Sequence, residues 1–174
     1  MKQIIIVRTN ERKLYYYEKE NKHWNFILKT KAYIGINGVS INKREGDGKT
    51  PLGIYKIGSS FGINDKINTK LDYFNINEKL YWVTDSNSLY YNELVNIDDV
   101  VKDWKSAEHL IEYPKQYEYA IVIKYNTKKK KEKGSAIFLH CDIEKDTAGC
   151  IAISKENMIE LLKRLNKNAI IMIC

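Results

Sequence analysis

The chain has 174 residues, of which 44% are hydrophobic and 29% are charged, and it contains 13 tyrosines but only 2 prolines. This composition excludes a disordered tail, a collagen-like chain and a low-complexity linker, and the length suits a single domain spanning residues 1–174. The formal net charge is +7. Such a balance fits a polyanionic partner, but it fits a generally lysine-rich composition equally well, so it identifies no partner.

No stretch approaches the roughly 18 apolar residues of a membrane-spanning helix, so we expect no transmembrane segment. Near the start, the apolar run 4–7 is shorter than the core of a secretory signal, which has about 7–15 residues. The sequence therefore shows no export signal, and it leaves open whether the protein acts inside the cell or outside it.

Three cysteines are present, Cys141, Cys150 and Cys174. Because their number is odd, at least one thiol is free in the monomer. No Cys-x-x-Cys or similar paired spacing occurs, so we predict no structural zinc site, and we expect neither a metal nor another cofactor.

Short apolar and aromatic runs separated by turn residues predict a series of strands. In chain order, the expected strands are 4–7, 13–18, 24–28, 31–36, 54–57, 80–84, 119–125, 136–140, 150–153 and 169–173. The segment 42–53 is rich in turn formers and predicts a loop, 61–77 is polar and irregular, and 127–134 is a charged hairpin tip.

Two helices are expected, over 98–110 and 155–166. In the first, Val100, Val101, Trp104 and Leu110 are roughly helically spaced after an acidic start. The second follows Ser154, a good N-cap residue, and its apolar residues recur at helical intervals; they are Met158, Leu161, Leu162 and Leu165. Many short strands with only two helices predict a mainly β fold, a sandwich or barrel.

The strongest chemical signal is the segment 139–154, in which His140 ends one expected strand and Cys150 begins another. Two strand ends joined by a loop can lie side by side, which would bring the imidazole to the thiol. The histidine would then take the thiol proton, leaving a thiolate to attack an acyl carbon. Gly149 permits unusual dihedral angles, and the N–H groups of Gly149 and Cys150 could form an oxyanion hole. A buried structural cysteine and a histidine that caps a strand remain the alternative interpretation.

The segment GDGKTPLG at 46–53 superficially resembles a phosphate-binding loop. That pattern requires a glycine at position 43, which is Lys43 here, so the match fails. A tight turn, in which Gly46 and Gly48 adopt positive φ and Pro51 fixes the exit, is the better interpretation.

Together, these segments resemble the catalytic domain of the L,D-transpeptidase family. The resemblance extends over essentially the whole chain, and the cysteine motif Thr-Ala-Gly-Cys indicates one branch of the family. The further segments that carry it are AYIGING at 32–38, WVTDSNSLYYN at 82–92, SAEHL at 106–110, YAIVIKYN at 119–126 and SAIFLHC at 135–141.

The resemblance implies a mainly β catalytic fold, with Cys150 as nucleophile, His140 as general base and Gly149 shaping the oxyanion site. It implies that the backbone carbonyl of Cys141 orients the histidine. The implied reaction is attack on the third residue of a tetrapeptide stem of peptidoglycan, with loss of the terminal D-Ala. Transfer to the side-chain amine of another stem would give a 3→3 cross-link, and transfer to water would be L,D-carboxypeptidase activity.

The resemblance also implies action outside the cytoplasm, at the cell wall, and acylation by β-lactams of the carbapenem class. Peptidoglycan stem peptides are thus the expected partners, no nucleic acid is expected because no RNA-binding motif occurs, and the oligomeric state is open. Many family members carry Ser-His-Gly-Cys followed two residues later by Arg, where this chain has Ala148 and Ala152. These departures leave the acyl donor and the balance of transfer and hydrolysis open.

Weaker candidates for substrate contact are Thr147 and Ala148 in the cysteine motif, Tyr91 and Asn92 in the 82–92 segment, and His109. A peptide-like substrate suits aromatic and amide side chains, but a strand-edge aromatic cluster and a partly buried histidine are equally good structural interpretations. Two other functions stay open: a different cysteine hydrolase of wall peptides, and a non-catalytic basic binding module.

Overall fold

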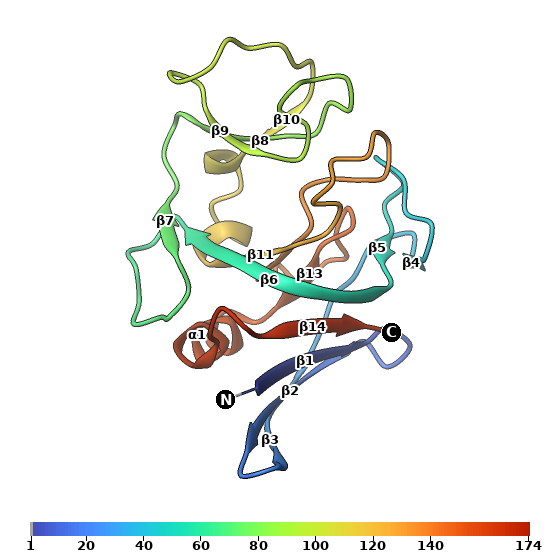
Figure 1. Cartoon of the computed structure of the whole chain (residues 1–174), viewed down its shortest axis with the longest axis vertical. Coiled ribbons are helices and arrows are strands. Elements are labelled where there is room, and N and C mark those ends of the chain that lie inside the picture. Colours follow the sequence, from blue (N-terminus) through green and yellow to red (C-terminus); the bar gives the residue numbers. More distant parts are fainter. Residues whose placement is uncertain (1) are drawn as a thin grey trace.

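In the computed structural model, which describes residues 2–174, the chain folds around one long curled sheet (Figure 1). The strand order of this sheet is β13 (Ile151–Ile153), β12 (Phe138–Cys141), β11 (Ala120–Ile123), β6 (Gly53–Gly62), β14 (Ile170–Ile173), β1 (Lys2–Arg8), β2 (Lys13–Glu20) and β3 (His23–Lys31), with β7 (Tyr73–Asn75) paired beside β6. The predicted mainly β fold is confirmed.

The N-terminal strands show why the sheet forms. Side chains alternate between its faces, and Ile5, Val7, Leu14 and Tyr16 are fully buried on one of them. Removing such a side chain from water stabilises the fold by about 1.5–3 kcal/mol.

The helix α1 (Lys155–Arg164) covers the buried face of this sheet. It follows Ser154 as predicted, but it ends two residues before the predicted end, because Leu165 is already extended. The hydroxyl of Ser154 makes no hydrogen bond to the backbone of the first turn and accepts one from the Asn157 amide instead.

The helix predicted over 98–110 is wrong. The structure has a strand there, β10 (Ala107–His109), followed by a single 3₁₀ turn, η1 (Leu110–Glu112). β10 pairs with β8 (Leu80–Val83), which also pairs with β9 (Leu94–Asn96). We call this three-stranded sheet the roof.

The apolar spacing that predicted the helix arises from two separate clusters. Trp104 packs with Val83 and Val95 inside the roof, whereas Leu110 packs against the main sheet and Val101 is 84% exposed. Carboxylates bind backbone N–H groups across this region, which offers the chain an alternative to helical hydrogen bonds. The N–H donors are Asn87 and Lys105 to Asp85, and Leu89 to Asp103.

Other predicted boundaries shift as well. The first of the two strands expected at 24–28 and 31–36 becomes the long β3, which ends at Lys31. Residues 33–36 instead hydrogen-bond the segment 147–152. The expected loop 42–53 contains the short β5 (Thr50–Pro51), which pairs with β4 (Val39–Ser40).

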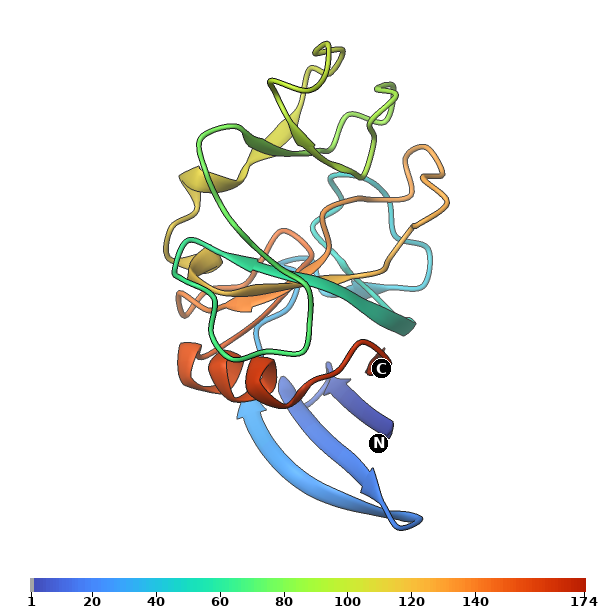
Figure 2. The same ribbon diagram turned by 60° about the vertical axis from the view of Figure 1, so that its left-hand side comes forward.

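The site described below lies between the roof and the main sheet. Figure 2 shows the roof at the top, α1 and the β2–β3 hairpin below, and β11 and β12 between them. The segment before β11 carries a second 3₁₀ turn, η2 (Gln116–Glu118), which contacts β12. Within residues 2–174, no helix has the length and apolar character needed to cross a bilayer.

Candidate active site

The strands β12 and β13 bring His140 and Cys150 to one place. They pair in parallel, with His140 opposite Ala152. Because side chains alternate along a strand, Cys150 lies on the same face as Ala152. All three residues line one cavity of about 210 Å³, so the predicted juxtaposition of the two strand ends is present in the fold.

A second cavity, of about 100 Å³, lies on another side of Cys150. Three residues line both cavities: Glu108 from the roof, and Ala148 and Cys150 from the motif loop. Thr147 lines the first cavity and Gly149 the second. The thiol therefore lies at the junction of two cavities.

The Cys150 thiol is buried and hydrogen-bonded to the backbone. Its Sγ donates to the carbonyl of Ala136 at 3.2 Å and accepts from the N–H of Phe138 at 3.3 Å. Burial raises the pKa of the thiol to about 12, with a further rise from the Glu108 carboxylate, while the Phe138 N–H and Lys43 work in the opposite direction. At neutral pH the residue is a thiol, and it needs a base to become a nucleophile.

His140 has the properties of such a base. Burial lowers the pKa of its imidazole to about 4, against the opposing effects of the Cys141 carbonyl and the Asp142 carboxylate. Its Nδ1 lies 2.8 Å from the carbonyl oxygen of Cys141. A carbonyl accepts only an N–H, so Nδ1 carries the proton and Nε2 has a free lone pair. The edge of the Tyr117 ring packs against the imidazole, with centroids 5.7 Å apart.

Gly149 has a conformation that an L side chain rarely adopts. Its φ is +146°, and an added Cβ would lie 2.9 Å from the backbone oxygen of Lys49. Its N–H donates to the Thr147 hydroxyl at 3.0 Å, and the same hydroxyl donates to the Cys150 carbonyl at 2.7 Å. The Gly149 N–H is thus already bound to Thr147 in this structure. Within residues 2–174 the Cys150 N–H donates no hydrogen bond.

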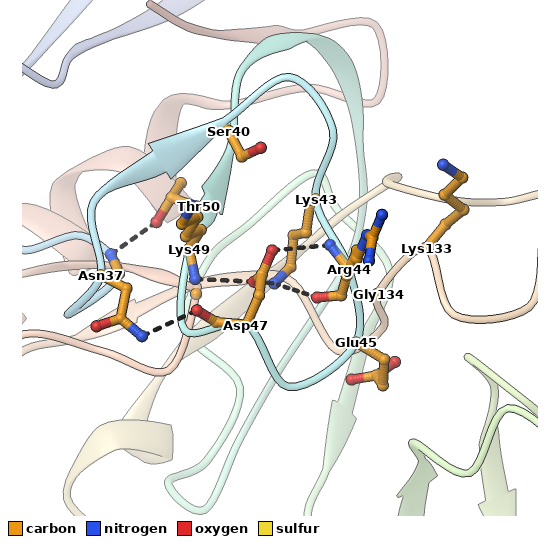
Figure 3. Close-up of polar contacts among 12 residues, drawn as sticks. Asn37, Ser40, Lys43, Arg44, Glu45, Asp47, Lys49, Thr50, Lys133 and Gly134 are labelled. Carbon is orange, nitrogen blue, oxygen red and sulfur yellow. Dashed lines mark hydrogen bonds and ion pairs between the residues drawn. The ribbon is translucent and has the colours of Figure 1, made fainter.

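The loop predicted as a tight turn is cross-linked by hydrogen bonds among its own residues (Figure 3). Asp47 is its centre: its carboxylate accepts from the N–H groups of Arg44 at 2.8 Å and Lys49 at 2.9 Å, and from Lys43 Nζ at 2.7 Å. Partial burial opposes ionisation, but these bonds hold the pKa of Asp47 below its usual value. The Thr50 hydroxyl attaches this loop to the cysteine motif by donating to the Cys150 carbonyl at 3.2 Å.

Lys43 lines the same cavity as Cys150. Its ammonium is buried, packs against Gly149 and lines the second cavity. The sequence interpretation used position 43 only to exclude a phosphate-binding loop. A lysine within a turn-rich loop has no sequence signal that distinguishes it from a solvated one.

Tyr91 and Asn92, predicted as substrate contacts, lie behind the cavities. The Tyr91 hydroxyl donates to Glu45 at 2.6 Å, and the Asn92 side chain binds the Ala136 N–H and the carbonyls of Tyr125 and Asn126. Neither residue lines either cavity. Both brace the segment that leads into β12.

His109 also points away from the cavities. It stacks on Tyr81 at 4.2 Å, and its ring nitrogens contact the Glu78 carbonyl and the Glu112 carboxylate. The residue before it, Glu108, faces the cavities instead, because neighbours in a strand point to opposite sides. Sequence reasoning missed Glu108, and the strand alternation of SAEHL is the signal that could have revealed it.

The sequence matches the L,D-transpeptidase catalytic domain, also named YkuD, over residues 2–173. The chain belongs to this family. The L,D-transpeptidase family comprises cysteine-dependent enzymes that act on the stem peptides of peptidoglycan. The resemblance drawn from the motifs is confirmed.

Solved structures share the fold of this L,D-transpeptidase-family domain. The helical cell shape determining protein Pgp2 from Campylobacter jejuni superposes with a TM-score of 0.57 at 18% identity, over 98% of this chain and 46% of that one. Bd1075 from Bdellovibrio bacteriovorus superposes with a TM-score of 0.52 at 19% identity, over 99% and 47%. This chain thus spans about half the length of the structures that it matches. Among curated proteins, no sequence matches it.

Proposed function

We propose that this domain is an acyl-transfer enzyme that acts on the third residue of peptidoglycan stem tetrapeptides, with Cys150 as nucleophile and His140 as general base. The observation that carries the proposal is the placement of a thiol and a neutral imidazole on one cavity, at the ends of paired strands, in a chain of this family. A purely structural cysteine has no need of two adjoining cavities.

The geometry supports a specific sequence of proton transfers. The Cys141 carbonyl holds the Nδ1 proton of His140, so Nε2 takes the proton of the Cys150 thiol. The thiolate then attacks the carbonyl carbon of the third residue, and the Cys150 N–H stabilises the oxyanion. The intermediate collapses to a thioester and expels D-Ala, whose amine receives the proton from the imidazolium.

The thioester has two fates. Attack by the side-chain amine of a second stem gives a 3→3 cross-link and restores the thiol, which is L,D-transpeptidation. Attack by water gives a tripeptide, which is L,D-carboxypeptidase activity. Because the substrate is a wall polymer, we place the site of action outside the cytoplasm.

The test is a mass-spectrometric digest of disaccharide-tetrapeptide fragments incubated with the protein. We expect dimers that lack one D-Ala, together with some tripeptide monomer, and we expect Cys150→Ala to form neither. His140→Ala should lower both products by about 10²- to 10⁴-fold, the usual contribution of a general base. Cys174→Ala, which changes an exposed thiol, is the matched control and should behave as the wild type.

Each outcome decides between the candidate functions. Tripeptide without dimer would assign the carboxypeptidase reaction. Equal product from the wild type and Cys150→Ala would remove the cysteine mechanism. No product at all from a folded protein, combined with no mass shift of Cys150 after incubation with a carbapenem, would favour the binding module.

A further inference from the structure

Glu108 is a roof residue that reaches the reacting centre. It lines both cavities and shares the junction with Cys150. Its Oε2 accepts a hydrogen bond of 2.5 Å from the Tyr117 hydroxyl. The Tyr117 ring in turn packs against His140, so the carboxyl group is held beside the thiol and the imidazole.

The other carboxyl oxygen is unoccupied by protein. Within residues 2–174, Oε1 accepts no hydrogen bond, whereas every fully buried side-chain oxygen in this range has a hydrogen-bond partner. Oε1 is therefore not fully buried, and it belongs to a side chain that lines both cavities. A carboxyl oxygen in this position is ready to accept a hydrogen bond from a ligand.

Within residues 2–174, the carboxylate of Glu108 forms no ion pair with a lysine, arginine or histidine. Lys43 lines the second cavity, but its ammonium binds Asp47. Glu45, which lines the same cavity, accepts from Tyr91 and Ser135 and repels a charge on Glu108. Burial raises the pKa of Glu108 to about 7, with Tyr117 opposing and Glu45 adding to the rise. A positively charged ligand group would satisfy this carboxylate.

We propose that Glu108 binds the ammonium group of the acyl acceptor and takes the proton that the amine must lose before it attacks the thioester. This inference rests on the proposed function and names the residue that receives the acceptor amine. The junction of the two cavities is the place where an acceptor meets the acyl group on Cys150, whichever cavity holds which substrate.

The protons balance. The ammonium gives one proton to the Glu108 carboxylate, and the resulting amine attacks the thioester carbon. Nitrogen then loses a second proton to His140, the C–S bond breaks, and the imidazolium returns that proton to the sulfur. The third proton stays on the new amide, and Glu108 releases its proton to solvent. Hydrolysis needs no ammonium group, so Glu108 has no corresponding role when water attacks.

The test is Glu108→Gln, which keeps the shape and still accepts from Tyr117 but cannot take a proton. We expect dimer formation to fall by about tenfold or more, the scale of a lost proton acceptor. Tripeptide release should fall less than dimer formation, because loss of a negative charge beside Cys150 does not hinder thiolate formation. Glu112→Gln, on an exposed side chain outside both cavities, is the matched control.

A second readout separates charge from shape. Hydroxylamine is uncharged at neutral pH and needs no proton removed before it attacks. Transfer to hydroxylamine should survive in Glu108→Gln, whereas transfer to a lysine side chain should be lost. Equal losses in dimer, hydroxamate and tripeptide would overturn the inference in favour of a structural role. A wild type that hydrolyses but accepts no amine would overturn it too, whereas a wild type without either product refutes the proposed function first.

Discussion

The two walls of the site are built in different ways. The floor, which consists of β12, β13 and residues 142–150 between them, fixes its groups through the backbone: the Cys150 thiol and the His140 ring both bind carbonyls. The roof offers Glu108, whose carboxyl group accepts a hydrogen bond from the hydroxyl of Tyr117. The floor thus holds the thiol and the imidazole in fixed positions, and the roof keeps one carboxyl oxygen of Glu108 available to a ligand.

In the proposed mechanism, the two walls control different parts of the reaction. Attack on the donor depends on a rigid thiol and base, which a continuous run of 16 residues, 139–154, supplies. Choice of the acceptor depends on a side chain that a separate sheet brings to the same point. Changes in the floor should therefore affect both products, and changes in the roof should affect mainly transfer.

Apart from the loss of Cys150 or His140 themselves, the largest effect should come from Gly149→Ala in the floor. Gly149 has a φ of +146°, and an added Cβ would lie 2.9 Å from the Lys49 oxygen. The substitution should therefore lower the free energy of unfolding by about 1–3 kcal/mol. Displacement of Cys150 should slow both transfer and hydrolysis by about 10- to 100-fold. Chemical denaturation and D-Ala release measure the two effects.

Gly38→Ala is the control for strain alone. Gly38 has φ +81° and nothing within 4 Å of an added Cβ, so stability should fall by about 1 kcal/mol while both rates stay unchanged. If Gly149→Ala kept wild-type rates per molecule of folded protein, the floor would not be the rigid element described above.

The walls should also respond to pH separately. A lowered pKa keeps His140 neutral, and therefore basic, down to about pH 4. The groups that face its ring are Cys150, Tyr117 and Asp142. Hydrolysis should thus fall to half near pH 4, rather than near 6.5, the ordinary pKa of histidine. Initial rates of D-Ala release between pH 3 and 8 measure this; a midpoint near 6.5 would contradict a buried base.

The pH profile of transfer should show a second ionisation, that of Glu108 in the roof. The raised pKa of Glu108, about 7, means that its carboxylate forms only as pH rises through 7. The ratio of dimer to tripeptide should therefore rise across pH 6–8 in the wild type. The ionisable groups around it include Tyr113, Tyr117, His140, Glu45, Lys43 and Cys150. Glu108→Gln should remove the part of the increase that comes from the glutamate, while the smaller increase from amine deprotonation remains.

Sequence predicts the main sheet and α1 better than the roof for a physical reason. The strands around Ile5 and Leu139 are apolar runs whose burial fixes their pairing, and α1 presents a regular apolar stripe. In the roof, the helical spacing of Val101, Trp104 and Leu110 was misleading, because tertiary clusters and carboxylates that bind backbone N–H groups override it. Pairing of β10 with β8 turns Glu108 toward the cavities.

The smallest effect should come from loosening the roof without touching Glu108. Asp103 accepts from the Ser88 hydroxyl at 2.5 Å and the Leu89 N–H at 2.8 Å. Asp103→Asn keeps one acceptor, so the free energy of unfolding should fall by about 1 kcal/mol, and hydrogen exchange at Leu89 should quicken. Asp99→Asn, which removes no side-chain hydrogen bond within residues 2–174, is the control. Hydrolysis should not change, and transfer should stay within about twofold. Because this variant disturbs the roof but keeps the carboxylate, a collapse of transfer would mean that roof rigidity, and not the charge of Glu108, selects the acceptor.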